Sequence, residues 1–129
     1  MDAEIYKQYE EYLTEIQKFA DEEIVNEPNI LVDKLARTAS YIASLGKCTA
    51  DCKKSLNEAK NRVFERKDGN KLLRTPPTIV GELLKAKCRE EIFLCDWCDR
   101  LGATLVHQAD ALKTMISYEK AQLSTLKFQ

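Results

Sequence analysis

The longest uninterrupted helical pattern in this chain of 129 residues runs over residues 29–67, NILVDKLARTASYIASLGKCTADCKKSLNEAKNRVFERK. Apolar and small residues recur there at spacings of three and four, and no proline interrupts them. These positions are Leu31, Leu35, Thr38, Ile42, Leu45, Thr49, Cys52, Leu56, Ala59 and Val63. At a rise of about 1.5 Å per residue the helix would be about 55 Å long. Helices of this length are typical of coiled-coil-like hairpins.

A second long helix is predicted over residues 76–126. Asp68-Gly69-Asn70 ends the first one, because glycine readily follows a helix C-terminus. Pro76 and Pro77 suit a first helical turn, with Thr75 or Thr78 as the N-cap. Its apolar stripe is Leu84, Cys88, Cys95, Cys98, Gly102, Leu105, Ala109, Leu112, Ile116 and Leu123, widened by Ile92, Leu101 and Val106.

The short connection between these helices predicts an antiparallel hairpin. If Lys67 and Thr78 lie at one level, Cys52 faces residues 92–95 and Gly46 lies near Gly102. Small residues at that last level would allow the two helices, or another helix, to approach closely.

An acidic helix is predicted before the hairpin, over residues 2–25, with Asp2 as its N-cap. A break follows at 26–29, which contains Pro28. The apolar stripe of this first helix consists of Ile5, Tyr9, Tyr12, Ile16 and Phe19. It must be covered either by the rest of the same chain or by another chain. The fold class is therefore all-α, with a long hairpin and an additional N-terminal helix in one domain, residues 1–129. Uncovered apolar stripes favour a homo-oligomer.

The net charge of −1 hides a strong asymmetry along the chain. Residues 1–33 carry ten acids and two lysines, whereas residues 53–89 carry eleven bases and four acids. Such asymmetry indicates a polyanionic partner.

The start of the chain and its cysteine content predict a cytoplasmic protein, in the host cytoplasm if the protein is phage-encoded. Met1-Asp2-Ala3-Glu4 has no basic region followed by an apolar run, so no secretory signal is expected. No run is long and apolar enough for a membrane span. The five cysteines are expected to be reduced thiols.

Four of the cysteines allow two interpretations. Cys95 and Cys98 form a CxxC, Cys48 and Cys52 are four apart, and the hairpin places both pairs at similar heights. A Cys₄ zinc site between the helices is geometrically possible. The preferred interpretation is core packing, because most of these residues lie on the apolar stripes and cysteine packs as a small hydrophobe. We therefore expect no metal site and no cofactor.

No catalytic constellation is recognisable. His107 is the single histidine, and no phosphate-binding glycine loop or HExxH pattern is present. The sequence predicts a protein that is not an enzyme.

The basic middle of the chain is the candidate binding site. Its residues are Lys53, Lys54, Lys60, Arg62, Arg66, Lys67, Lys71, Arg74, Lys85, Lys87 and Arg89. Clustered cations bind phosphates by releasing counterions, and Phe64 and Phe93 could stack on bases. An acidic protein partner and a simply solvated surface are the alternatives.

The run KKSLNEAKNRVF at 53–64, followed by Asp68-Gly69, resembles the basic helix and turn of phage recombination mediators of the UvsY kind. The segment from Trp97 to ALKTMI at 111–116 is similar to that family's last helix. The resemblance covers about residues 30–120 and consists of spacing and residue type. It implies a ring-forming helical protein that binds single-stranded DNA and helps load a RecA-like recombinase by displacing a single-strand-binding protein. It matches Lys53, Lys54, Lys60 and Arg62 to the DNA-contacting helix, and the other seven bases follow from charge alone.

The predicted function is thus that of a non-catalytic accessory factor in DNA recombination that binds single strands. The alternative is a helical protein–protein interaction module or a phage-encoded inhibitor of a host complex, for which the acidic first helix could mimic DNA. The sequence leaves open whether DNA or RNA is bound.

Overall fold

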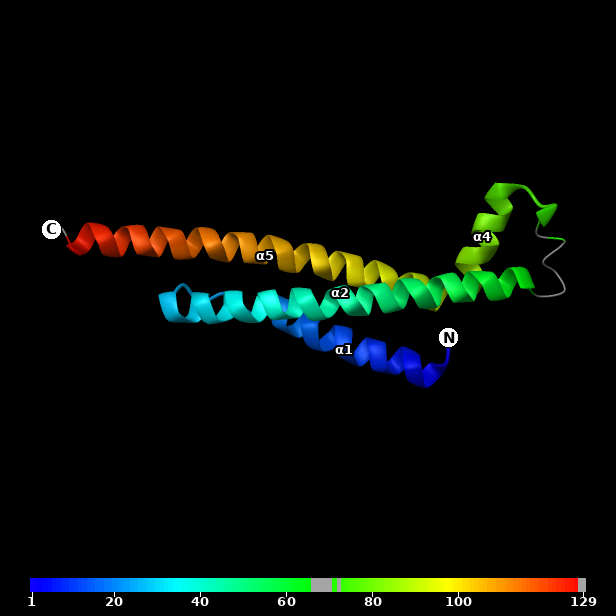
Figure 1. Ribbon diagram of the computed structural model, residues 1–129, viewed down its shortest axis with the longest axis horizontal. Coiled ribbons are helices and arrows are strands. Elements are labelled where there is room, and N and C mark those ends of the chain that lie inside the picture. Colours follow the sequence, from blue (N-terminus) through cyan, green and yellow to red (C-terminus); the bar gives the residue numbers. More distant parts are fainter. Residues whose placement is uncertain (66–70, 72, 128–129) are drawn as a thin grey trace.

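The computed structural model describes residues 1–65, 71 and 73–127, except the side chain of residue 127. Every regular element in these ranges is α-helical: α1 (Ala3–Asp21), α2 (Pro28–Glu65), α4 (Pro77–Lys87) and α5 (Arg89–Lys127). The all-α prediction is confirmed. Figure 1 shows α2 and α5 lying along each other in opposite directions, with α1 beneath them. The predicted helix end and turn at residues 66–70 lie outside the described residues.

The apolar stripe predicted for α2 is confirmed. Six of its ten positions are buried and the other four are half-buried, so none is exposed. The helix begins at Pro28, whose missing N–H has no helical partner at a first position. Because α5 covers this stripe along most of α2, the pair forms the long axis of the molecule.

The prediction of a single helix over residues 76–126 is wrong, because two helices, α4 and α5, occupy this range. The chain bends at Cys88, whose φ of −107° and ψ of 26° leave the helical region, and α4 stands away from the α2–α5 pair. The bend occurs where the Cys88 side chain is fully buried against Ala59 and Val63 of α2. The N-cap of α4 is Pro76 rather than Thr75 or Thr78.

The register between α2 and α5 differs from the predicted one by about one turn at its centre. Cys52 lies against Cys98, with 3.8 Å between the two Sγ atoms, and not against residues 92–95. At the level of the glycines the predicted pairing agrees to within one residue, because a Cβ at Gly102 would lie 3.7 Å from the side chain of Leu45, next to Gly46.

The first helix packs in cis, against α5 and α2. Asp2 is its N-cap as predicted, since its Oδ1 accepts hydrogen bonds from the N–H groups of Glu4 and Ile5. The helix ends at Asp21 rather than at residue 25, because Glu22 adopts an extended backbone with ψ of 138°. Acidic side chains at a helix C-terminus oppose the helix dipole, which disfavours continuation through Glu22 and Glu23.

A buried lysine ties the end of α1 to α2. The Nζ of Lys34 donates to the carbonyl oxygen of Phe19 at 2.7 Å and lies 3.0 Å from Oε2 of Glu22. It also lies 3.7 Å from the centre of the Phe19 ring. This contact satisfies a carbonyl of the last helical turn and lowers the pKa of Glu22 through hydrogen bonding and charge.

The main core lies where three helices meet. Leu13, Ile16 and Phe19 of α1 pack there against buried residues of α2 and α5: Leu45, Cys48, Cys52, Leu94, Cys95, Cys98, Leu101 and Leu105. The predicted α1 stripe is thus partly confirmed, although Ile5 is 47% exposed and the fully buried Leu13 lies outside it. None of the described helices is long and apolar enough to cross a membrane.

Candidate functional site

The predicted basic residues lie at the end of the molecule where α2 ends and α4 begins, which we call the basic end. It comprises residues 53–65, 71, 73–76, α4 and Arg89. Lys60 is half-buried, and the other predicted bases within the described ranges are exposed: Lys53, Lys54, Arg62, Lys71, Arg74, Lys85, Lys87 and Arg89. The predicted Arg66 and Lys67 lie outside the described residues.

These cations do not share one face of α2. Lys53 and Lys60 are seven residues apart and therefore lie on one side of the helix, together with Phe64. Arg62 instead lines a pocket with Asp2 and Glu58, beside the start of α1. The basic end is therefore a charged surface that surrounds the helix, rather than a single basic stripe.

Few of the cations of the basic end are paired. Lys53 lies 3.5 Å from Asp99, and Lys85 lies 3.6 Å from Glu82. All four side chains are at least half-exposed, so both pairs are weak and a phosphate could compete for them. Over the part of the chain that the structure describes, the other seven predicted cations form no ion pair.

The two phenylalanines proposed for base stacking lie in different settings. Phe64 is 37% exposed and is next to Lys60 on one side of α2. Phe93 is 51% exposed, and its ring centroid lies 5.7 Å from that of Trp97. Trp97 in turn donates a hydrogen bond to Gln17 of α1, which places this aromatic pair on the α1 side. Only Phe64 lies among the cations of the Lys53–Lys60 side.

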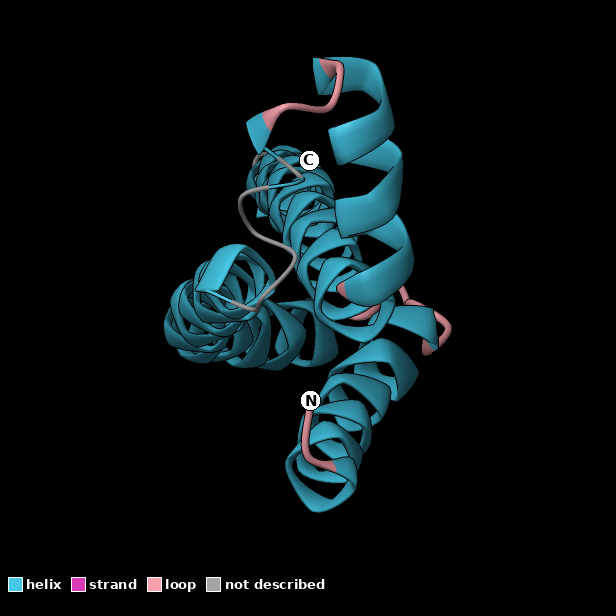
Figure 2. Ribbon diagram, turned by 90° about the vertical axis from the view of Figure 1, so that its right-hand side faces the viewer, coloured by secondary structure: helices cyan, strands magenta, loops and turns pink. Residues whose placement is uncertain are grey.

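The helix α4 exposes apolar side chains that the sequence interpretation missed. It has no buried residue, and Ile79 and Leu83 are 51% and 37% exposed. Figure 2, viewed from the basic end, shows α4 at the top and α1 at the bottom, with α2 and α5 between them. The sequence interpretation placed neither Ile79 nor Leu83 on the predicted apolar stripe, which begins at Leu84, and it assigned them no role.

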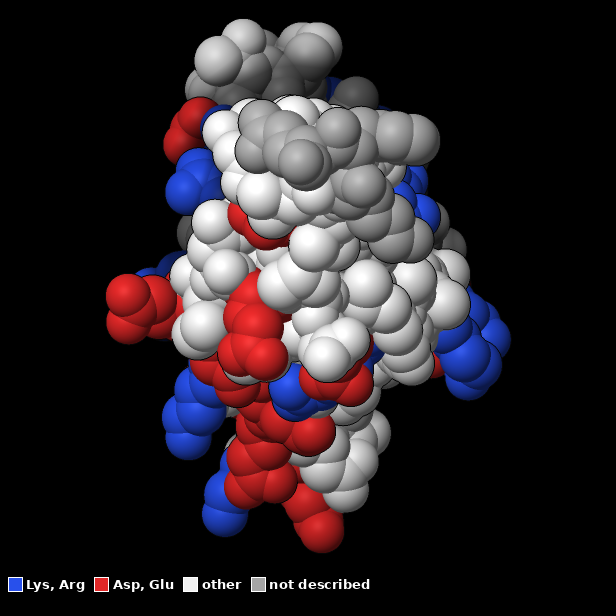
Figure 3. Space-filling view, turned by 90° about the vertical axis from the view of Figure 1, so that its left-hand side faces the viewer, with Lys and Arg blue, Asp and Glu red and all other residues white. Residues whose placement is uncertain are grey.

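The acidic part of the chain forms a separate surface. The five carboxylates of α1 are all exposed: Glu4, Glu10, Glu11, Glu15 and Asp21. Figure 3, viewed from the end opposite the basic end, shows acidic side chains gathered over the lower part, where α1 lies. The charge asymmetry of the sequence is thus also an asymmetry in space.

Three cysteines meet inside the core. The Sγ atoms of Cys48, Cys52 and Cys98 all lie within 4.8 Å of one another. All five cysteines are buried free thiols, but Cys95 and Cys88 are not part of this group. The burial of these cysteines agrees with the preferred interpretation of core packing, and the alternative arrangement of four cysteines is not formed because Cys95 lies outside the group. His107 is exposed on α5 and takes no part in the group.

The pKa values of these thiols are shifted in opposite directions by the hydrogen bonds between them. Hydrogen bonds with Cys48 and Cys52 lower the pKa of the Cys98 thiol. Hydrogen bonds with Cys48 and Cys98, together with burial, raise the pKa of Cys52.

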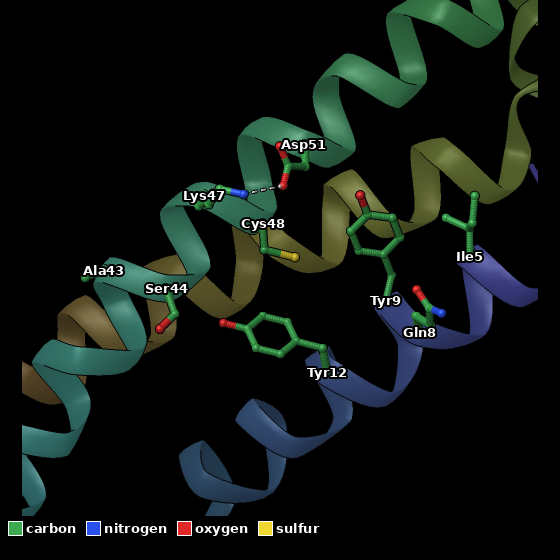
Figure 4. A pocket seen from close by; sticks show the side chains of 9 residues that line it. All are labelled: Ile5, Gln8, Tyr9, Tyr12, Ala43, Ser44, Lys47, Cys48 and Asp51. Atoms are coloured by element: carbon green, nitrogen blue, oxygen red, sulfur yellow. Dashed lines mark ion pairs between the residues drawn. The ribbon is translucent and has the colours of Figure 1, made fainter.

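A pocket of about 660 Å³ leads to this group between α1 and α2. Cys48 lines it together with Tyr9, Tyr12 and Asp51. Figure 4 shows both tyrosines pointing from α1 towards α2, on either side of Cys48. The pocket gives small molecules or ions a route to the Cys48 sulfur.

Comparisons with known proteins add no relative: no protein-family model, curated protein or solved structure matches the chain. The resemblance to mediators of the UvsY kind therefore stays a prediction based on residue type and spacing.

Proposed function

We propose that this protein is a non-catalytic accessory factor that binds single-stranded nucleic acid through its basic end. One observation carries the proposal: the described residues between 53 and 89 contain nine bases and only three acids, Glu58, Glu65 and Glu82. Eight of the nine bases are exposed, and seven of the nine are without an ion pair in the described ranges. Such a surface gains free energy by displacing the counterions of a polyphosphate.

The side of α2 that carries Lys53, Lys60 and Phe64 is the preferred binding surface. Its two cations and one exposed ring match the combination that single-strand binders use, namely charge along the backbone and an aromatic face for a base. A duplex offers no unstacked bases to Phe64, so single strands are the favoured ligand.

The resemblance to UvsY-like mediators supports a more specific role in DNA recombination. In that role Lys53, Lys54, Lys60 and Arg62 contact the strand, and the partners are a RecA-like recombinase and a single-strand-binding protein in the cytoplasm. Self-association into a coiled-coil-like assembly belongs to the same proposal. Leu123 and Leu126, which are 54% and 65% exposed near the end of α5, are available for it.

A second candidate function is a protein–protein interaction module. It is favoured by α4, which exposes Ile79 and Leu83 and buries none of its own residues. Such a module would bind its partner through apolar contacts, so its affinity would depend weakly on salt.

The test is fluorescence anisotropy of a labelled oligo-dT strand titrated with the protein at several salt concentrations. We expect binding that weakens steeply with salt. The double variant Lys53→Glu with Lys60→Glu should weaken it by about tenfold or more. It should also reduce the salt slope by about 0.7 for each phosphate that the variant no longer neutralises.

The matched control is Lys113→Glu with Lys120→Glu, which makes the same charge change at exposed positions of α5 away from the basic end. The proposal is wrong if the wild-type protein does not bind at low salt, or if the control variant loses as much affinity as the test variant.

A further inference from the structure

We infer that Cys48, Cys52 and Cys98 form a binding site for a thiophilic metal ion of the Zn²⁺ kind, held by three sulfurs between α2 and α5. The site lies in the three-helix core and does not depend on nucleic-acid binding at the basic end.

The distances between the sulfur atoms fit such an ion. A Zn–S bond of about 2.3 Å in tetrahedral geometry places two sulfurs about 3.8 Å apart. The Sγ atoms of Cys52 and Cys98 are 3.8 Å apart, and Cys48 Sγ lies within 4.8 Å of both. Shortening the distances from Cys48 Sγ to about 3.8 Å would complete a three-sulfur site.

The two helices supply the ligands at fixed positions. Cys48 and Cys52 are one helical turn apart, so their side chains share a face of α2. Cys98 reaches the same level from α5. Ligands on two packed helices are preorganised, and metal binding would in turn fasten α2 to α5.

The chemistry of the surrounding groups favours sulfur as the donor. Over the described residues, the possible ligand atoms that lie within 4.8 Å of one another are the sulfurs of Cys48, Cys52 and Cys98, and no carboxylate oxygen belongs to the group. Three thiolates with few competing oxygen donors select thiophilic ions such as Zn²⁺ over Mg²⁺ or Ca²⁺.

The pocket between α1 and α2 provides a fourth coordination position. Cys48 lines this pocket of about 660 Å³, where Tyr9 and Tyr12 flank it (Figure 4). Cys98 and Cys52 are each 1% exposed, so the ion would enter from the Cys48 side. A water molecule in the pocket would complete the tetrahedron, as in zinc sites with three protein ligands.

The experiment is titration of the reduced, metal-free full-length chain with Co²⁺ under anaerobic conditions, followed by absorption. We expect one Co²⁺ per chain, sulfur-to-cobalt charge-transfer absorption in the near ultraviolet and the visible bands of tetrahedral cobalt. Stoichiometric Zn²⁺ should then abolish these bands. Cys52→Ala and Cys98→Ala should each weaken binding by more than about 100-fold, since even indirect partners of a metal ligand contribute 10- to 100-fold.

The matched control is Cys95→Ala, which removes another buried cysteine of the same core that lies outside the group. It should bind Co²⁺ with nearly the wild-type affinity. Alkylation followed by mass spectrometry gives a second readout in the unmutated chain: Zn²⁺ should slow the modification of Cys48, Cys52 and Cys98 relative to the metal-free protein, whereas the slow rates at the buried Cys88 and Cys95 should change little.

Three results would overturn the inference. The first is the absence of cobalt charge-transfer absorption in the folded wild-type protein. The second is an equal loss of affinity in Cys95→Ala and Cys98→Ala. The third is a Cys52–Cys98 disulfide that forms in air while the reduced protein takes up no metal.

Discussion

The three-helix half of this molecule and its basic end use the same two long helices in different ways. Where α1 covers α2 and α5, leucines, cysteines and aromatic residues from three helices share one core. Among the described residues of the basic end and the adjoining Cys88, only the cluster of Ala59, Val63 and Cys88 is buried, and α4 buries none of its own residues. Stability is therefore concentrated in one half, whereas charged and apolar groups at the other half are left available for a partner.

The largest expected difference in the free energy of unfolding is between two alanine variants, one at an apolar residue of each half. Leu101 is 1% exposed in the three-helix core, so Leu101→Ala should lower the free energy of unfolding by about 3 kcal/mol. Ile79 on α4 is 51% exposed, and Ile79→Ala should change it by about 0.5 kcal/mol or less. Urea unfolding followed by circular dichroism measures both, and equal effects would refute the contrast.

The next effect concerns the attachment of α1. Lys34→Met should lower the free energy of unfolding by about 2 kcal/mol, because the Phe19 carbonyl no longer has its buried charged donor. Arg37→Met is the control, since Arg37 is exposed and its guanidinium carbon lies 4.8 Å from the centroid of the same Phe19 ring. Chemical denaturation that finds no difference between these variants would show that Lys34 does not hold α1 in place.

Much of this contrast could be predicted from the sequence because helical periodicity reports directly on burial. Every position of the stripe predicted for α2 is at least half-buried, and the Asp2 cap is present. On α5 the prediction failed at Val106 and Leu123, which are 47% and 54% exposed. An apolar residue at a suitable spacing is buried only if a neighbouring helix reaches it, and spacing alone does not contain that information.

The sequence around Cys88 contains no residue that would predict the bend between α4 and α5. Sharp bends usually occur at proline, glycine or an inserted residue, and residues 84–92 contain neither proline nor glycine. The bend coincides with the packing of Cys88 against Ala59 and Val63 of α2, a tertiary contact that local sequence does not reveal. The membership of the three-cysteine group depends on how α2 packs against α5, so the sequence could suggest a cysteine site but not its ligands.

A smaller effect tests the start of α1. Asp2→Ala should lower the free energy of unfolding by about 1 kcal/mol, because the first N–H groups of α1 lose their acceptor. Asp2→Asn is the conservative control and should retain most of the stability. Thermal unfolding of the three proteins checks this prediction, and a destabilised Asn variant alongside a stable Ala variant would contradict it.

The smallest effect on stability is expected at the basic end itself. Lys87→Gln should leave the free energy of unfolding unchanged within about 0.5 kcal/mol, because Lys87 is exposed. If Lys87 contacts a phosphate, the salt slope of oligo-dT binding should fall by about 0.7. A variant that unfolds more readily would show that α4 contributes more to the fold than its burial indicates.

Hydrogen–deuterium exchange of the full-length chain with and without an oligo-dT strand tests the central claim most directly, because it locates the partner and reports on both halves at once. The account predicts that residues 53–65 and 77–89 gain protection when the strand binds, whereas α1 and the core of α5 exchange as before. Protection that appears on α1 instead, or no change at the basic end under conditions of binding, would contradict it.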